Sequence, residues 1–189
     1  MKLLQTELPG VLIVEPAVFR DDRGWFMESW NAARFADGVS ALGQPRPRDF
    51  VQDNHSCSSA GVLRGLHYQL PPHPQGKLVR VVKGAAFDVA VDIRRSSPHF
   101  GRWVGVELTG TNHRQLWVPE GFAHAFVALE DDTHFLYKTT DVYARDCERA
   151  IRWDDPALAI AWPLPGGTAP KVAPKDAAAP QLAEAETFS

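Results

Sequence analysis

The sequence predicts an all-β protein, an antiparallel jelly roll with short peripheral helices. Between residues 62 and 140, short segments of alternating apolar and polar residues recur roughly every 10–15 residues, which is the rhythm of a sandwich or barrel. The 14 glycines and 15 prolines are scattered along the chain, where they favour turns between strands. Helical patterning of comparable length is absent from the sequence, so a helical fold is the weaker interpretation.

The predicted elements begin with a short helix near residues 27–35 and a strand-like segment at 63–69. The clearest strand is 87–93, in which every odd-numbered residue is apolar and aspartate occupies positions 88 and 92. Similar alternation predicts strands at 78–82, 103–108, 114–118, 123–129 and 134–140. A second short helix is expected at 181–186.

The length of 189 residues predicts one domain spanning residues 1–189. A hydrophobic content of 44% with 10% aromatic residues is ample for a buried core. The C-terminal segment 163–189 is rich in proline and alanine, a composition that by itself is typical of a mobile tail.

Charge and hydropathy exclude several classes of protein. With 20 Lys and Arg against 23 Asp and Glu, the net charge of -3 argues against a nucleic-acid partner. No run of about 18 apolar residues could cross a membrane, and the N-terminus lacks the apolar core of a signal peptide. We therefore expect a cytoplasmic protein with no membrane partner. Cys57 and Cys147 lack the spacing of a disulfide framework or zinc knuckle and are interpreted as ordinary thiols.

Three polar residues on strand-like segments suggest acid–base chemistry. His67, Tyr137 and Lys77 would supply a base, an acid and a cation, the set needed to move protons next to a carbonyl. Alternate residues of a barrel strand face its interior, where a small ligand can bind. Taken singly, a histidine or tyrosine on an apolar face is more often a hydrogen-bonded core residue.

A metal site is the alternative interpretation of the same segments. The pattern Pro119-x-Gly121-x-x-His124 resembles the second metal motif of the cupins. The first cupin motif needs two histidines separated by one residue and a downstream glutamate, so that three or four ligands converge. Here Gln69 follows His67 in that spacing, and we expect no bound metal.

Motifs along nearly the whole chain match one enzyme family. They are Leu8-Pro9-Gly10-Val11, the segments 19–28, 52–56, 63–69, 75–80, 118–124 and 151–156, and the residues Tyr137, Tyr143, Lys175 and Asp176. On these motifs the chain resembles the dTDP-4-dehydrorhamnose 3,5-epimerases of deoxysugar biosynthesis. The resemblance implies a cupin-like jelly roll that works without metal or other cofactor, usually as a homodimer.

The implied reaction inverts C3 and C5 of dTDP-4-dehydro-6-deoxy-glucose to give dTDP-4-dehydro-L-rhamnose. The C4 ketone acidifies the hydrogens on both carbons, so a base and an acid must stand on opposite faces of the sugar. The resemblance implies His67 as the base, Asp176 as the carboxylate that orients it, and Tyr137 as the acid. Lys77 would stabilise the enolate oxygen.

The resemblance also assigns substrate-binding residues. Arg23 and Arg64 would pair with the diphosphate, since guanidinium forks match phosphate oxygens. The remaining implied contacts are Glu28, Gln52 and Asn54 to the nucleotide, Tyr143 to thymine, and His124, Glu148 and Lys175 around the site. Without the resemblance, Arg23 would read as a turn residue and Glu148 as a solvated charge.

Two geometric expectations follow from these assignments. Arg64 and His67 are three residues apart, so both can face one ligand only if the strand is irregular, and Gly65 is the obvious place. Asp176 can reach His67 only if residues 171–176 are ordered and the C-terminal segment folds back over the barrel. The alternatives are an epimerase of C3 alone or C5 alone acting on a related dTDP-4-keto-6-deoxysugar, and a non-catalytic sugar-nucleotide binding protein.

Overall fold

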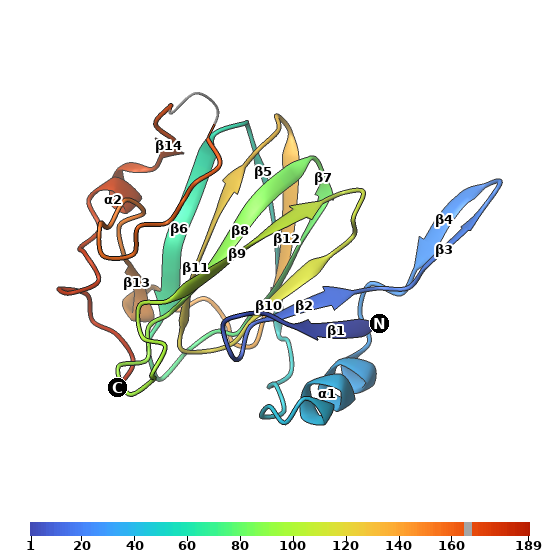
Figure 1. Ribbon diagram of the computed structural model, residues 1–189, viewed down its shortest axis with the longest axis horizontal. Coiled ribbons are helices and arrows are strands. Elements are labelled where there is room, and N and C mark those ends of the chain that lie inside the picture. Colours follow the sequence, from blue (N-terminus) through green and yellow to red (C-terminus); the bar gives the residue numbers. More distant parts are fainter. Residues whose placement is uncertain (165–167) are drawn as a thin grey trace.

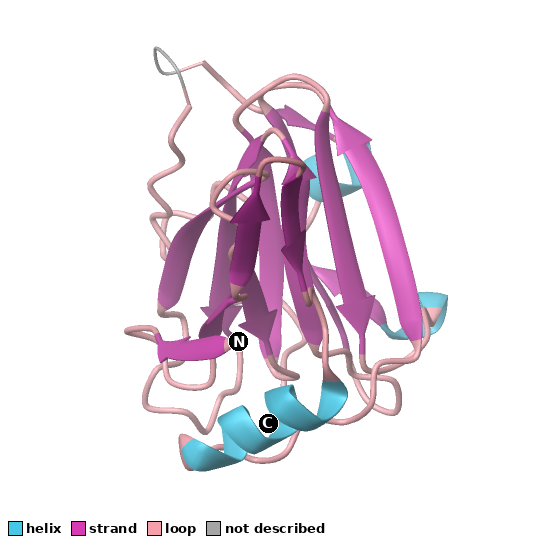
Figure 2. Ribbon diagram, turned by 90° about the vertical axis from the view of Figure 1, so that its right-hand side faces the viewer, coloured by secondary structure: helices cyan, strands magenta, loops and turns pink. Residues whose placement is uncertain are grey.

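The computed structural model describes residues 1–164 and 168–189 and contains two large antiparallel sheets that face each other (Figures 1 and 2). The elements in chain order are β1 (Lys2–Gln5), β2 (Leu12–Glu15), β3 (Val18–Asp21), β4 (Gly24–Met27), α1 (Ala32–Ala41), β5 (Gln52–Ser58), β6 (Val62–Gln69), β7 (Lys77–Lys83), β8 (Ala85–Asp92), β9 (Trp103–Thr109), β10 (Gln115–Val118), β11 (Phe122–Ala128), β12 (Thr133–Thr139), the 3-10 turn η1 (Arg145–Cys147), β13 (Glu148–Ala150), β14 (Lys171–Val172) and α2 (Pro174–Ala177).

One sheet has the strand order β1-β2-β10-β7-β12-β5, and the other has the order β13-β6-β11-β8-β9. These crossovers between strands distant in sequence confirm the predicted jelly roll. Each strand predicted between residues 78 and 140 is present to within a few residues. Among the described residues, no helix combines the length and hydropathy needed to cross a membrane.

The helix predictions were less accurate than the strand predictions. The helix predicted at 27–35 begins only at Ala32, because residues up to Met27 pair in β4 and Asn31 caps the helix by accepting the Arg34 N–H at 3.1 Å. Residues 181–186 form a turn rather than a helix. The short helix of the C-terminal segment lies instead at α2, where Pro174 occupies the first turn.

Two buried hydrophobic clusters cover the two faces of the sheet that contains β8. The first fills the space between the sheets, where Phe126 and Phe135 stack with ring centroids 4.0 Å apart. The second lies on the outer face, where Val89 and Val91 pack against residues that follow β13, including Leu182. Strand β8 is therefore buried on both faces.

The C-terminal segment lies against the barrel from residue 171 onward. Strand β14 pairs in parallel with the start of β6, and the Tyr68 hydroxyl donates to the Glu186 carbonyl at 2.6 Å. The Leu182 N–H donates to buried Asp155 at 2.6 Å. Residues 171–176 are thus ordered against β6 as expected, whereas 165–167 of the predicted segment 163–189 lie outside the described residues.

The irregularity expected near Gly65 is confirmed. Strands β6 and β11 pair His67 with His124 and Arg64 with Phe126, so three steps on β6 match two on β11. This is a β-bulge, and Gly65 sits inside it with φ of 132°. The extra residue allows Arg64 and His67 to line the same cavity.

Replacing Gly65 with alanine should destabilise the fold by about 3 kcal/mol, because overpacking adds to an unfavourable backbone conformation. An added Cβ would lie 2.5 Å from the Ala125 Cβ and 2.6 Å from the His124 carbonyl oxygen. Gly61→Ala is the matched control, since Gly61 also has positive φ but no atom within 4 Å of an added Cβ; it should cost only about 1 kcal/mol. Urea unfolding of both variants tests this, and equal losses would contradict it.

Candidate active site

A cavity of about 450 Å³ opens between the two sheets and is lined from both. A second hollow of about 310 Å³ adjoins it and shares His67, Lys77, Tyr137 and Glu148 with it. All but two of the residues predicted for the site line one or both hollows. The residues that do so are His67, Lys77, Tyr137, Asp176, Gln52, Asn54, Arg64, His124, Tyr143, Glu148 and Lys175.

The shortest polar contact in the cavity joins His67 to Asp176. The imidazole Nε2 lies 2.7 Å from Asp176 Oδ1, and the Gly65 N–H donates to Asp176 Oδ2 at 3.4 Å. Burial alone would raise the pKa of Asp176, but the hydrogen bonds from His67 and Gly65 outweigh it and lower the pKa. An ionised carboxylate only accepts, so Nε2–H donates to it and Nδ1 is left with the lone pair.

Lys77 brings a cation into the cavity from the opposite sheet. Its side chain is almost fully buried, and Nζ donates to the His67 carbonyl at 3.3 Å. Burial lowers the pKa of Lys77 to about 8, although the charges of Asp88 and Glu148 oppose this. The ammonium is therefore protonated at neutral pH but close to its titration range.

Asp88, which was not among the residues predicted for the site, contacts His124 of the cavity. It is fully buried in β8, and its carboxylate lies 2.9 Å from His124 Nε2. Burial raises the pKa of Asp88 despite His124 and Lys77. The sequence held one signal for this role: Asp88 is a charged residue in the middle of a strongly patterned strand. A charge that is buried there needs a specific partner. The pair places a second imidazole–carboxylate unit directly beside His67, which is opposite His124 in the ladder.

Tyr137 faces His67 from the other wall of the cavity. It lies on β12, whereas His67 lies on β6 of the other large sheet. Burial raises the pKa of the phenol, which keeps it protonated at neutral pH. Within residues 1–164 and 168–189 the hydroxyl has no hydrogen-bond partner, so it is free to meet a ligand.

A polar network surrounds the mouth of the smaller hollow. Glu148 accepts from Lys175 Nζ and from the Tyr143 hydroxyl, each at 3.1 Å. Gln52 accepts the Tyr143 N–H at 3.0 Å and donates to Asn54 at 3.0 Å. Burial would raise the pKa of Glu148, but Lys175 and Tyr143 outweigh it and lower the pKa. The C-terminal segment and strand β5 are thus tied together around one opening.

Arg64 reaches the rim of the larger cavity from the bulge. Its Nε donates to Ser58 Oγ at 3.1 Å and its Nη2 to the Cys57 carbonyl at 3.3 Å. The guanidinium lies in the exposed part of the rim. It remains the one predicted diphosphate-binding arginine that lines the cavity of this chain.

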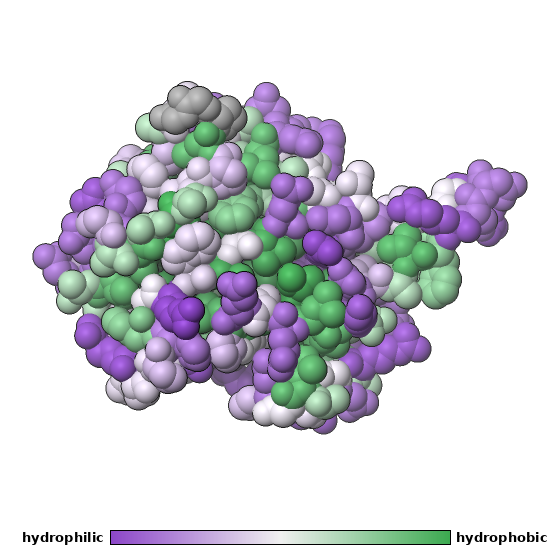
Figure 3. Space-filling view, viewed as in Figure 1, coloured by the Kyte–Doolittle hydropathy of each residue, from purple (hydrophilic) through white to green (hydrophobic). Residues whose placement is uncertain are grey.

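Arg23 and Glu28 do not lie near His67 in the same chain. Arg23 is at the tip of the β3–β4 hairpin, which projects from the body on the side opposite α2 (Figures 1 and 3), and pairs with Asp21 at 2.6 Å. Glu28, at the base of the hairpin, pairs with Arg34 at 3.0 Å. Neither residue lines the two hollows that contain His67 in the same chain.

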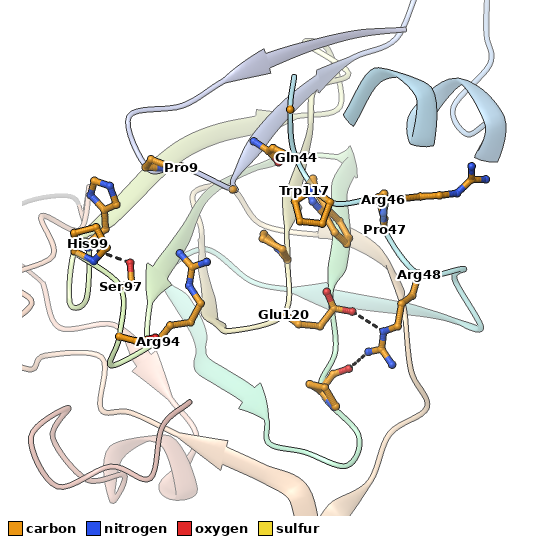
Figure 4. Close-up of a pocket in the computed structure, with 17 residues that line it drawn as sticks. Pro9, Gln44, Arg46, Pro47, Arg48, Arg94, Ser97, His99, Trp117 and Glu120 are labelled. Carbon is orange, nitrogen blue, oxygen red and sulfur yellow. Dashed lines mark hydrogen bonds and ion pairs between the residues drawn. The ribbon is translucent and has the colours of Figure 1, made fainter. Parts of the chain in front are cut away.

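A separate cavity of about 830 Å³ at the end of the barrel contains no predicted site residue (Figure 4). Two of its arginines are paired: Arg48 bonds Glu120 at 2.9 Å (Figure 4), and Arg94 bonds Asp92 at 2.6 Å. Its volume exceeds that of the His67 cavity, but the acid–base groups are in the latter.

The chain is a cupin-like jelly roll that has titratable side chains on both walls of an internal cavity. The family model described as dTDP-4-dehydrorhamnose 3,5-epimerase matches residues 5–184. The chain belongs to this family, and since epimerases are isomerases it is an enzyme of that class.

Relatives support this placement along the whole chain. A dTDP-4-dehydrorhamnose 3,5-epimerase of Shigella flexneri is 53% identical over 188 residues, 100% of this chain and 99% of the relative. The crystal structure of a dTDP-6-deoxy-D-glucose-3,5-epimerase from Legionella pneumophila, in complex with dTDP-4-keto-L-rhamnose, has 49% identity and a TM-score of 0.88, covering 97% and 93% of the two chains. A 3'-monoepimerase from Streptomyces bikiniensis, in complex with dTDP-quinovose, has 35% identity and a TM-score of 0.83, covering 97% and 88%.

Proposed function

We propose that this enzyme inverts C3 and C5 of dTDP-4-dehydro-6-deoxy-glucose and forms dTDP-4-dehydro-L-rhamnose. The observation that carries the proposal is the placement of the His67–Asp176 pair and Tyr137 on facing sheets around one cavity. Inversion next to a ketone needs a base on one face of the sugar and an acid on the other. The proposal includes a cytoplasmic location and no metal or other cofactor.

In this mechanism His67 removes the proton at each carbon. Its Nδ1 accepts the proton, while Asp176 holds Nε2–H and stabilises the imidazolium that forms. The electron pair of the broken C–H bond moves into the C4 carbonyl and gives an enolate. Lys77 would place its ammonium near the enolate oxygen, where a fixed charge stabilises the developing negative charge.

Tyr137 would complete each inversion by delivering a proton to the opposite face. The phenol is protonated because burial raises its pKa, and its hydroxyl is not engaged by any described residue. Before the second inversion, the phenolate that remains must recover a proton and the imidazolium of His67 must release one. The walls of the cavity thus supply the two opposite proton-transfer groups that the reaction requires.

The dTDP portion would bind along the rim and the smaller hollow. Arg64 would pair with the diphosphate, and Tyr143 would stack on thymine beside Gln52 and Asn54. Glu148, Lys175 and His124 would close the site around the sugar. The bound complex of the Legionella relative supports a dTDP-sugar as the substrate.

Arg23 and Glu28 would act in a homodimer. On the hairpin that carries Arg23, the exposed fractions of Phe19, Trp25 and Phe26 are 64%, 52% and 69%. Such an exposed apolar patch is typical of a surface that packs against another protein. If the hairpin packs on a second copy, Arg23 can reach the diphosphate in that copy's cavity. Light scattering of the purified protein tests this: a dimer is expected, and a monomer with full activity would contradict the assignment.

Deuterium exchange tests the reaction itself. The protein is incubated with dTDP-4-keto-6-deoxyglucose in deuterated water, and C3 and C5 are followed by NMR. Exchange and inversion at both carbons are expected. Exchange at one carbon would instead identify a single-centre epimerase, an alternative favoured by the similarity to a 3'-monoepimerase. Exchange at neither carbon would exclude epimerisation.

A parallel assay with a chelator tests the alternative of a metal-dependent cupin. Loss of activity with the chelator would favour that alternative.

The rate should fall as the pH rises through about 8, the pKa of Lys77, because the neutral amine no longer stabilises the enolate. The group is protonated and effective below this value, so the loss lies on the alkaline side. Lys77→Met should lower kcat at pH 7 by about 10²-fold and remove this alkaline limb. Measuring kcat of the unmodified enzyme and of Lys77→Met across pH 6–10 tests both expectations. If the variant keeps the same alkaline limb, that limb belongs to the titration of another group.

A further inference from the structure

Four side chains with metal-binding atoms gather on the outer face of β5 and β12, away from the catalytic cavity. Cys57 and His134 are directly opposite each other in the antiparallel register, and His55 precedes Cys57 by two residues on the same face. Asp132 lies in the turn that leads into β12. Ser56, between the two β5 residues, faces the catalytic cavity instead. The cluster is therefore a separate feature on the other side of the sheet.

The distances within the cluster suit a small metal ion. The ligand atoms of Cys57, Asp132 and His134 all lie within 4.8 Å of one another. Asp132 Oδ1 is 3.1 Å from both Cys57 Sγ and His134 Nε2. Bonds of about 2.0–2.3 Å to a tetrahedral zinc ion separate its ligands by roughly 3.3–3.8 Å. The separations in the cluster, from 3.1 Å to at most 4.8 Å, bracket that range.

The surroundings of the cluster support the same chemistry. His55 Nε2 lies 2.9 Å from His134 Nδ1, so Nδ1–H can donate to His55 while Nε2 presents its lone pair. Metal-binding histidines almost always have such a partner on the other ring nitrogen. Lys83 pairs with Asp132 through Oδ2, which leaves Oδ1 for a ligand. Two strands hold three of the four residues in fixed register.

We propose that Cys57, Asp132 and His134 bind one Zn²⁺ ion, with His55 as the hydrogen-bonding partner of His134. A thiolate, an imidazole and a carboxylate together are a ligand set typical of zinc. Three protein ligands leave the fourth position for water. This site is independent of the proposed epimerisation. Without metal, the same residues form a hydrogen-bonded group centred on Asp132, and that is the competing explanation.

Titration of the metal-stripped protein with Co²⁺ alone tests the site. A cobalt–thiolate charge-transfer band in the near ultraviolet is expected, and one equivalent of Zn²⁺ should abolish it. Cys57→Ser and His134→Gln should lose the band. Cys147→Ser is the matched control, since Cys147 is the other free cysteine and lies outside the cluster, and it should retain the band. Circular dichroism verifies that each variant is folded.

The affinity for Zn²⁺, measured by calorimetry, adds a graded test. His55→Ala should weaken binding by about 10–100-fold, the usual effect of removing a hydrogen-bonding partner of a metal-binding histidine. Absence of the band in the unmodified protein, its persistence in Cys57→Ser or its loss in Cys147→Ser would overturn the proposal. Because the readout is metal binding, failure of the epimerase assay would not affect it.

Discussion

Replacing His67 with alanine should lower deuterium exchange at both C3 and C5 by about 10²–10⁴-fold, the usual contribution of a positioned general base. Alanine cannot accept a proton, and the loss also leaves Asp176 buried without its 2.7 Å partner. Both carbons are affected together because one imidazole serves both proton abstractions. NMR of the substrate in deuterated water measures the two rates separately.

Two further variants make this result specific. His99→Ala removes a histidine far from the cavity, on the rim of the separate hollow in Figure 4, and should leave exchange unchanged. Asp176→Asn keeps the hydrogen-bonding shape but removes the charge that stabilises the imidazolium, so an intermediate loss is expected. If His67→Ala kept more than a tenth of the normal exchange, the base would be another group, and His124 beside Asp88 would be the next candidate.

Replacing Tyr137 with phenylalanine should separate exchange from inversion. The change removes one oxygen atom that has no partner among the described residues, so the fold should be unaffected. His67 still removes protons, but the opposite face has no acid, and inversion should fall by about 10²-fold or more. The product is expected to carry deuterium with retained configuration, which NMR distinguishes from inverted product.

Tyr143→Phe is the matched control for this experiment. It also removes one phenol oxygen, but at the rim, where the hydroxyl donates to Glu148. We expect a higher KM and an unchanged ratio of exchange to inversion. Normal inversion of both centres by Tyr137→Phe would remove Tyr137 as the acid.

Local patterns predicted the strands and three candidate site residues, His67, Tyr137 and Lys77, whereas the family resemblance supplied the other site residues. Alternation of side chains repeats every two residues, so β7 to β12 could be located from sequence with small errors. Because the resemblance places Arg64 and His67 at one ligand, their spacing of three residues predicted the bulge: a regular strand cannot direct both side chains to one ligand. The helices were less accurate, since a few residues with caps and prolines carry little periodic signal.

The resemblance assigned roles but could not place every residue. It named Arg23 and Glu28, yet neither residue lines the cavity that contains His67 in the same chain. It did not identify Asp88, whose burial depends on β8 having both faces covered. The layers that pack on a strand determine the surroundings of its aspartates. An aspartate can therefore face solvent in one fold and a histidine in another.

Residue type and two-residue periodicity were sufficient to predict a jelly roll with a histidine, a tyrosine and a lysine on its strands. Which distant segments of the chain meet follows from the packing of the folded molecule. Asp176 reaches His67 because the C-terminal segment packs on β6, although its composition is typical of a mobile tail. Cys57 and Asp132 meet because β5 and β12 pair in one register. Such contacts depend on the packing of whole sheets, and no local pattern encodes them.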